Sequence, residues 1–261
     1  MRVLNIGHAL IALACIGLGI LGLIFDDFAM NWQPVPTDLP AREWLAYLSA
    51  LILLVGGGAV LFERSAAMAA STLGGFFALW LITLQIPKLF SAPLSAASWL
   101  GIGETLELVM GLSCLWLLTA ATQPRQPRFL TTRLALLGFG LSLPMIGLSH
   151  FVYAKETAAI VPAWLPFRIG FAYLTGAGHI AAGLALIARR IPRIALLLEA
   201  IMMSSFVLLV HLPGVAADPH NRFQWTMMLV AMAISGCAWS AHALSRKALP
   251  ISPTKSQALA T

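Results

Sequence analysis

Four ionisable side chains lie inside long apolar stretches in the second half of the sequence: His150, His179, Glu199 and His211. An ionisable group in the interior of a bilayer is costly, so such groups are candidates for function. Imidazole nitrogens form hydrogen bonds and transfer protons near neutral pH. These residues therefore predict a membrane site for hydrogen bonding and proton transfer.

Each of the four also has a purely structural interpretation. His150 ends an apolar stretch beside aromatic residues, as interfacial side chains do, and His211 can cap carbonyls at the end of its helix. His179 lies within 175–183, a run of small residues that lets a neighbouring helix approach closely. Glu199 can form an ion pair with the arginines that precede it. The sequence leaves both interpretations open for all four.

A repeated octamer supplies further candidates. The pattern V-P-x-x-L-P-x-R occupies 35–42 and again 161–168, and in both copies a tyrosine follows the arginine by five positions. These pairs are Arg42 with Tyr47 and Arg168 with Tyr173, and the second octamer also contains Trp164. The prolines keep the loop extended up to the start of a helix. The pairs are therefore either interfacial anchors or one wall of an outward-facing pocket.

The octamer belongs to an internal duplication with a constant offset of 126 positions, which also aligns Pro87 with Pro213. Chance does not keep one register across turns, helices and loops. We therefore predict two tandem units, 1–126 and 127–261. The first unit is degenerate in its polar residues, because His179, Glu199 and His211 correspond to Leu53, Leu73 and Gln85.

The first unit nevertheless has polar residues of its own. Glu104 and Glu107 are three positions apart and so share one face of a helix. Gln85 stands at the position of His211. With Arg42, Tyr47 and Glu199 these residues form a secondary set of polar candidates.

The composition shows which elements must position these side chains. Hydrophobic residues make up 59% of the chain and charged residues 10%, whereas a soluble domain has roughly 25% charged residues. About 20 apolar residues form a helix long enough to cross a bilayer. Stretches of this length lie near 4–25, 44–62, 67–87, 100–121, 130–151, 169–188, 194–212 and 225–245. We therefore predict an all-α polytopic integral membrane protein with eight transmembrane helices, arranged as two parallel four-helix bundle repeats because each unit contains an even number of spans.

The cationic residues are distributed unequally between the two sides. Eleven Lys and Arg residues fall on the faces that include both termini, and five fall on the other faces. The positive-inside rule then predicts that the N-terminus and the C-terminus are both cytoplasmic. The net charge of +6 is spread over short gaps between apolar stretches, which indicates the lipid bilayer as the partner and no nucleic acid. The three cysteines lie inside spans and are interpreted as packing residues.

No metal site is predicted, since the zinc, phosphate-loop and dinucleotide motifs are absent from the sequence. His150 and His211 lie at similar depth, as axial haem ligands would, but their spacing does not determine whether they face each other. The wide spacing of the polar groups suits a flat amphipathic ligand better than a metal ion, whose ligands lie about 2–2.6 Å away.

Three segments of the second unit are G-L-S-H-F at 147–151, V-P-A-W-L-P at 161–166 and A-Y-L-T-G-A-G-H-I-A-A-G at 172–183. Together they resemble the DoxX-like family of small four-helix bacterial membrane proteins. The resemblance is good over roughly 130–245 and weaker over 4–121. It implies a four-helix bundle for each unit and a place in the bacterial cytoplasmic (inner) membrane. By motif position, the family-like residues are His150, Trp164, Pro166, Tyr173 and His179.

Some members of that family belong to a quinone-linked thiosulfate oxidoreductase or to thiol-oxidant defence complexes. The resemblance therefore implies a membrane subunit of a quinone-linked sulfur or thiol redox system, with a quinone as its ligand and a redox protein as its partner. The alternative is a small-molecule transporter or a structural membrane partner without catalytic activity. Whether the chain is itself an enzyme stays open.

The two functions predict different surroundings for the polar groups. We expect His150, Arg168, Tyr173, His179 and His211 to converge on one pocket in the outer half of the membrane. A quinone pocket should open sideways to lipid, whereas a transport path should connect His179 to both faces.

Overall fold

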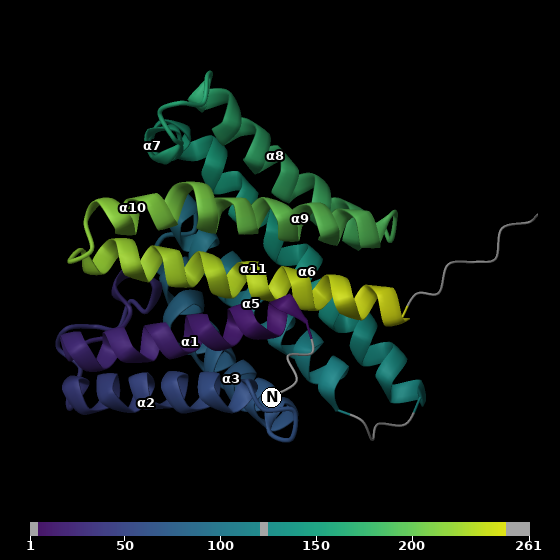
Figure 1. Cartoon of the computed structure of the whole chain (residues 1–261), viewed down its shortest axis with the longest axis horizontal. Helices are drawn as coiled ribbons and strands as arrows, with labels where there is room; N and C mark the ends of the chain where they lie inside the picture. Colours follow the sequence, from purple (N-terminus) through teal and green to yellow (C-terminus); the bar gives the residue numbers. More distant parts are fainter. Residues whose placement is uncertain (1–4, 121–124, 249–261) are drawn as a thin grey trace, which may run out of the picture.

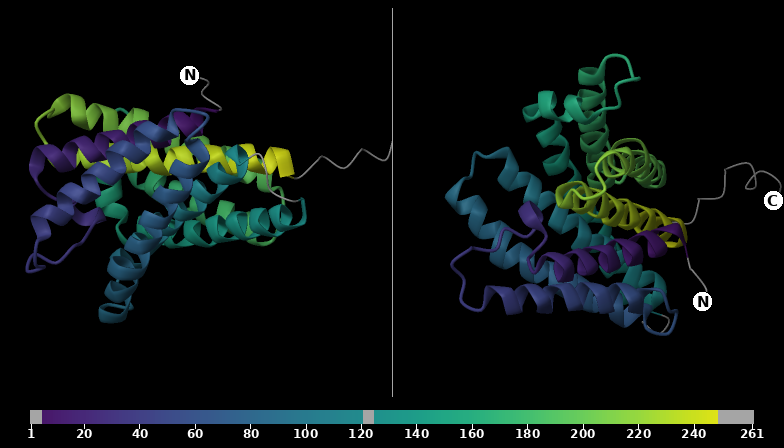
Figure 2. Two further views of the ribbon diagram at one scale, coloured as in Figure 1. Left: turned by 90° about the horizontal axis from the view of Figure 1, so that it is seen from below. Right: turned by 60° about the vertical axis from the view of Figure 1, so that its left-hand side comes forward.

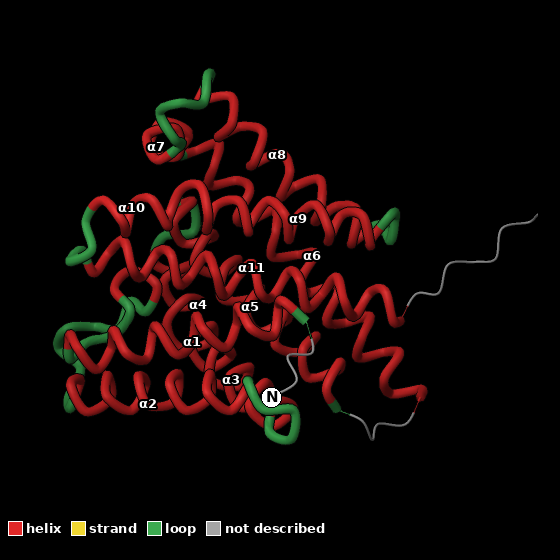
Figure 3. The backbone as a smooth tube through the Cα atoms, in the orientation of Figure 1, coloured by secondary structure: helices red, strands yellow, loops and turns green. Residues whose placement is uncertain are grey.

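The computed structural model describes residues 5–120 and 125–248, and in these residues the chain consists of helices joined by short loops (Figure 3). In the first half, the helices are α1 (Ile6–Phe25), η1 (Met30–Trp32), α2 (Arg42–Val60), α3 (Ala66–Trp80), η2 (Leu81–Gln85), α4 (Ile86–Ser91) and α5 (Ala96–Thr119). In the second half, they are α6 (Arg125–Val152), α7 (Ala154–Ile160), α8 (Arg168–Ile187), α9 (Pro192–Phe206), η3 (Val207–His211), α10 (Leu212–Ala217) and α11 (Arg222–Ala248).

Eight helices of the described residues are long and apolar enough to cross a membrane. This confirms the all-helical prediction and the number of long apolar helices. Two of them extend beyond their predicted ends, since α3, η2 and α4 form one rod over Ala66–Ser91 and α9, η3 and α10 form another over Pro192–Ala217. The sequence placed these ends near Pro87 and Pro213, because proline normally stops a helix.

The two prolines are tolerated because a π-helical turn comes directly before each rod's final segment. In η2 the N–H of Ile86 bonds to the carbonyl of Leu81, and in η3 the N–H of Leu212 bonds to that of Val207. This i to i+5 pattern widens the helix locally. Proline then falls in the first turn of α4 or α10, where its missing N–H costs little.

The helix boundaries follow the 126-position offset of the sequence. The π turn begins at Leu81 in one half and at Val207 in the other. The loop before the last helix also closes in the same way, because Trp99 Nε1 donates to the Pro93 carbonyl over 2.9 Å and Trp225 Nε1 to the Pro219 carbonyl over 2.8 Å. From the start of α2 and of α8 onward, equivalent positions in the two halves thus have the same local structure, whereas the preceding segments differ, with η1 in the first half and α7 in the second.

The two halves interlock instead of forming separate bundles (Figure 1). Helix α1 packs on α2 of its own half and on α11 of the other, whereas α6 packs on α8 and on α5. At the centre α5 crosses α11, and α7 and α8 form one edge of the molecule (Figure 2). Each long N-terminal helix of a half is therefore held by the last helix of the other half.

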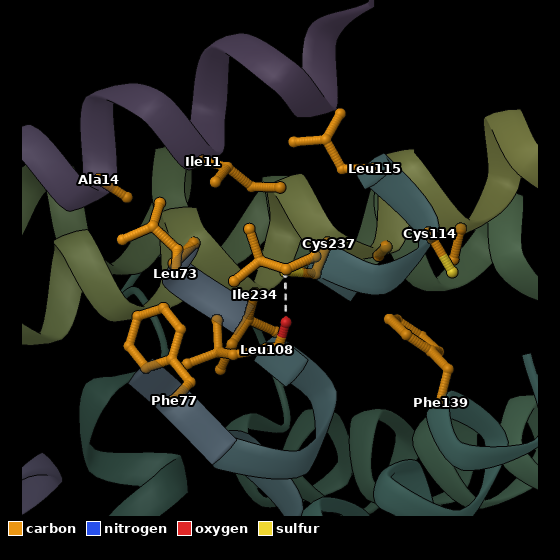
Figure 4. Close-up of a cluster of buried hydrophobic side chains, with 14 of the residues drawn as sticks. Ile11, Ala14, Leu73, Phe77, Leu108, Cys114, Leu115, Phe139, Ile234 and Cys237 are labelled. Carbon is orange, nitrogen blue, oxygen red and sulfur yellow. Dashed lines mark hydrogen bonds between the residues drawn. The ribbon is translucent and has the colours of Figure 1, made fainter. Parts of the chain in front are cut away.

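One core runs through both halves. It contains Ile11 and Leu73 from the first half, with Leu108 beside Ile234 and Cys237 from the second (Figure 4). The cysteines Cys15, Cys114 and Cys237 are all buried with free thiols, as expected for packing residues. The Cys237 Sγ lies 4.0 Å from the Leu108 carbonyl oxygen.

The outward faces of the helices are strongly apolar. Large side chains such as Trp44, Val55, Met68, Leu174 and Leu208 are more than half exposed. Soluble monomers rarely expose apolar surface over every helix. The outside of this molecule therefore suits an apolar surrounding.

Candidate functional site

A cavity of about 340 Å³ lies in the second half of the fold. Its wall comes from α6, α7 and the loop after it, α8, α9, η3 and α11, and α5 of the first half closes one side. Most of the lining is apolar, including Ile146, Phe206 and Ile234. The polar part includes His150, His179, His211 and Glu104, with Ser149, Thr175 and Ser205. The structure thus brings together the three predicted histidines from three different elements.

His150 is held in place at the end of α6. Its Nδ1 lies 3.0 Å from Oγ1 of Thr175 on α8, and its ring is 5.2 Å from the ring of His179 between centroids. Phe206 stacks on His150 with an interplanar angle of 26° and also lies 6.3 Å from the ring of His179 between centroids. Because Thr175 and His179 are four positions apart on α8, both point toward α6. The imidazole of His150 is therefore fixed by a hydroxyl and by two rings.

His179 and Glu199 form a contact between α8 and α9. Nδ1 of His179 lies 2.8 Å from Oε1 of Glu199, and both side chains are completely buried. The distance is that of an ion pair, although the ring N–H does not point straight at the oxygen. Within the described residues, neither ring nitrogen of His179 and neither carboxyl oxygen of Glu199 makes an aligned hydrogen bond.

Two acids from the first half complete this polar region. Glu104 lines the cavity, and Glu107, one turn further along α5, is completely buried. The carboxyl group of Glu107 interacts electrostatically with Glu199 and with Glu104, and neither of its oxygens has a hydrogen-bond partner in the part of the chain that the structure describes. The polar cluster is therefore built from both halves of the chain.

His211 enters the cavity from the last residue of the π-helical turn η3. A π turn changes the angular position of the residues that follow it along a helix. His211 is separated from Glu199 by twelve positions on the same rod, so it contributes a polar group to the cavity nearer the end of that rod.

The other primary candidates lie outside the cavity. Trp164, Arg168 and Tyr173 are exposed on the outer surface, and the Tyr173 ring stacks on Phe151 at 5.6 Å. The helical period gives the reason for Tyr173. It is two positions before Thr175 on α8, and hence about 200° around the helix from the face that forms the cavity. The expected convergence thus holds for the three histidines and does not extend to the arginine and the tyrosine.

Three secondary candidates of the first half, Arg42, Tyr47 and Gln85, have structural partners. Arg42 Nη1 lies 2.6 Å from Asp27, and the Tyr47 hydroxyl donates to Asp26 over 2.7 Å. Gln85 is buried and donates from Nε2 to the Trp32 carbonyl over 3.2 Å. These contacts hold the loop 26–41 against α2 and the rod that contains η2.

Asp27 and Arg222 form an ion pair that the sequence did not predict. Arg222, at the start of α11, donates to Asp27 over 3.3 Å and to the Phe28 carbonyl over 2.5 Å. Partial burial raises the pKa of Asp27, but hydrogen bonds from Arg42, the Phe28 backbone and Arg222 outweigh it and hold the pKa below its ordinary value. The sequence showed two acids in a loop, with no signal of which arginine would reach them.

In the first half, Trp32 occupies the space that corresponds to the cavity of the second half. Its ring lies 5.6 Å from those of Phe77 and Trp80, and Gln85 bonds to its carbonyl. The counterparts of these three neighbours at the 126-position offset are Met203, Phe206 and His211, which all line the cavity. The same offset aligns Trp32 with Ala158 of α7, which has no ring to place in the cavity and does not line it.

A second hollow of about 200 Å³ lies between α8 and α9. Small residues such as Gly178 and Ala182 line it, with Leu198 and Glu199. His179 faces the main cavity and Glu199 faces this groove. The His179–Glu199 contact thus forms the partition between the two.

Within the described residues, no group of three or more His, Cys, Asp or Glu side chains is placed to hold a metal ion. Comparisons with protein-family models, with curated proteins and with solved structures found no match to this chain. The resemblance to the DoxX-like family therefore has no support from these comparisons and stays a prediction.

Proposed function

We propose that the chain is a multi-pass membrane protein whose second half binds a flat amphipathic molecule, with a quinone headgroup as the first candidate. The membrane location is supported by the eight long apolar helices and by the exposed apolar side chains on their outer faces. A bacterial cytoplasmic membrane is the location that the DoxX-like resemblance implies.

The orientation follows from the charges at the two ends of the bundle. Arg193 donates to the carbonyl of Arg246 over 3.4 Å at one end, and Asp27 binds Arg42 and Arg222 at the other. The first end belongs to the faces with the excess of Lys and Arg, so we place it in the cytoplasm together with both termini. The cavity, which α5 and α11 line near their starts, then lies in the outer half of the membrane.

We also propose that the two halves are parallel repeats related by an axis along the membrane normal. The 126-position register of helix ends, π turns and tryptophan hydrogen bonds supports this arrangement. In this view the second repeat keeps the binding cavity, and the first serves as a scaffold whose equivalent space is filled by Trp32.

The observation that carries the binding function is the composition of the cavity wall. Three histidines and a few hydroxyl groups are set in an otherwise apolar lining, in a volume of about 340 Å³. Small-molecule sites have this form, an apolar hollow of about 300–1,000 Å³ with few polar groups that orient the ligand. A quinone headgroup matches it, since its flat ring is apolar and its carbonyl oxygens accept hydrogen bonds from imidazole N–H groups.

The role in the cell that fits this ligand is a membrane subunit of a quinone-linked sulfur or thiol redox system. The three cysteines are buried away from the cavity wall, so the sulfur chemistry would come from a partner protein. Transport of a small molecule is the second candidate. The groove beside Glu199 favours it, because His179 lines the cavity and its contact partner Glu199 lines the groove.

Purification in mild detergent, followed by lipid extraction and an optical spectrum, tests the ligand class directly. We expect a quinone to copurify, and a short-chain quinone analogue to bind at least about tenfold more weakly to His179→Leu than to the wild type. His220→Ala is the matched control, since His220 is an exposed loop histidine. Equal binding by all three proteins would exclude the cavity as the site.

A further inference from the structure

The buried histidine–glutamate contact has a chemical consequence beyond binding. Among the ion pairs of residues 5–120 and 125–248, His179–Glu199 is the one whose two side chains are completely buried. The carboxyl group of Glu199, the imidazole of His179 and the cavity follow one another in this order. Oε1 of Glu199 lies 2.8 Å from Nδ1 on one side of the ring, although the N–H is not aligned with it, and Nε2 has no partner among the described residues although His179 lines the cavity.

We propose that His179 and Glu199 form a carboxylate–histidine dyad that presents Nε2 to the cavity as a proton acceptor, and that the cavity therefore takes ligands with an acidic aromatic hydroxyl group. For a quinone-type ligand this selects the reduced quinol form. The proposal rests on the proposed function, since it specifies which ligand the same cavity accepts.

The tautomer of the His179 imidazole determines which ligand groups its Nε2 can bind. A carboxylate accepts hydrogen bonds but does not donate them, so Glu199 at 2.8 Å from Nδ1 stabilises the form with the proton on that nitrogen. The lone pair of neutral His179 is then on Nε2. The outer torsion of histidine is broad, so a rotation of the ring is enough to bring the N–H in line with Glu199. A hydroxyl donor in the cavity satisfies Nε2, whereas a ligand with acceptors alone leaves it unpaired.

The geometry of the cluster singles out Glu199 as the partner of His179. The neighbouring ionisable groups are Glu104 and Glu107 on α5, His150 on α6 and Cys237 on α11. Of the three carboxyl groups in the cluster, Glu199 is the one in contact with an imidazole. This contact assigns the role of hydrogen-bond acceptor for Nδ1 to Glu199 and not to Glu104 or Glu107.

The proton step is balanced without any further reactant. The O–H bond of the ligand breaks and an N–H bond forms at Nε2. The products are an aryloxide ligand and an imidazolium that Glu199 stabilises from the Nδ1 side. His179 is the proton acceptor, and Glu199 is a positioning residue that does not touch the ligand.

The equivalent positions in the first half of the chain argue against a purely structural role for the His179–Glu199 pair. The residues at the corresponding positions are Leu53 and Leu73, which are 1% and 0% exposed. The same fold thus accepts two leucines where the second half has a buried ion pair. Replacing such a pair by apolar residues is often neutral for stability, so the fold by itself does not require an ion pair at these positions.

The first experiment needs no ligand. In protein labelled with ¹⁵N-histidine, the ring nitrogen shifts report which nitrogen carries the proton, and a difference against His179→Leu assigns the signal. We expect the Nδ1–H form in the wild type and loss of that preference in Glu199→Gln. A wild-type signal with the proton on Nε2 would overturn the dyad.

The second experiment uses two dyes of the same shape, 4-nitrophenol and its methyl ether 4-nitroanisole. We expect the wild type to bind the phenol at least about tenfold more tightly than the ether, with the bound phenol showing the absorption of its aryloxide. Glu199→Gln should bind the phenol in its neutral form with no preference left over the ether. The double variant His179→Leu/Glu199→Leu, which matches the pair of the first half, is the folding control.

The outcomes separate the two proposals. Equal affinity of the wild type for the phenol and the ether overturns the dyad while leaving the cavity as a binding site. Failure of both dyes to bind contradicts the proposed binding of flat aromatic ligands, and the ¹⁵N spectra then still decide whether the dyad exists.

Discussion

Arg222 donates from Nη1 to Oδ2 of Asp27 over 3.3 Å, although the two residues are 195 positions apart. Arg42 binds the other oxygen of the same carboxylate at 2.6 Å. Asp27 therefore joins the start of α2 to the start of α11 at the end of the bundle where the cavity lies. Because α1 also packs on α11, this carboxylate reinforces the interlocked arrangement of the two halves.

We expect Asp27→Asn to lower the free energy of unfolding by about 1–3 kcal/mol, because the charged hydrogen bonds to two arginines are lost. Thermal unfolding in detergent measures the change. Asp38→Asn in the same loop is the control, since Asp38 is exposed and such substitutions stay within about 0.5 kcal/mol. Equal effects of the two substitutions would show that the link contributes nothing.

The same link has a pH dependence with a defined sign. The pKa of Asp27 is lowered from its ordinary value of 3.8, so its contribution is fully present above that pH and is lost as the pH falls through the lower value of the folded state. The melting temperature of the wild type should therefore fall below about pH 4 more steeply than that of Asp27→Asn. Parallel curves would contradict the assignment of this loss to Asp27.

Trp32→Ala should open in the first half a cavity equivalent to that of the second. Deleting a buried tryptophan side chain costs about 3–5 kcal/mol, and Trp32 contacts Phe77 and Trp80. We expect a lower melting temperature that benzene partly restores, because an empty apolar cavity binds such ligands. Trp44→Ala, at a position that is 73% exposed, should neither lose as much stability nor respond to benzene.

Two glycines provide a matched test of the packing between the halves. A Cβ at Gly7 on α1 would collide with the backbone of α11 at Gly236, whereas a Cβ at Gly58 on α2 meets open space. We expect Gly7→Ala to destabilise the protein by about 1–3 kcal/mol and Gly58→Ala to stabilise it by up to about 1 kcal/mol. A neutral Gly7→Ala would show that α1 and α11 are less closely packed than described.

Thr175→Val tests the positioning of His150 with almost no change in volume. The substitution removes the hydroxyl that lies 3.0 Å from His150 Nδ1, so the imidazole loses its fixed orientation in the cavity. We expect the affinity for a short-chain quinone analogue to fall about three- to tenfold with the fold intact by circular dichroism. Unchanged affinity would show that His150 does not orient the ligand.

The sequence by itself determined the long apolar helices, the 126-position register and the choice of the three histidines. Apolar length and repeat spacing are local properties of the chain, and they carry over directly into helices. Helical phase also separates Tyr173 from His179 on α8, which are six positions and hence about 240° apart. Attention to this angle would have removed Tyr173 from the expected pocket without a structure.

Only the tertiary structure decided which helices meet across the two halves. Glu104 and Glu107 face the His179–Glu199 pair because α5 crosses α11 and packs on α6, and Arg222 reaches Asp27 because α1 lies along α11. The filling of one cavity by Trp32 likewise depends on where a loop folds back. Such contacts depend on helix crossings and loop paths, which result from packing over the whole molecule and leave no periodic signal in the local sequence.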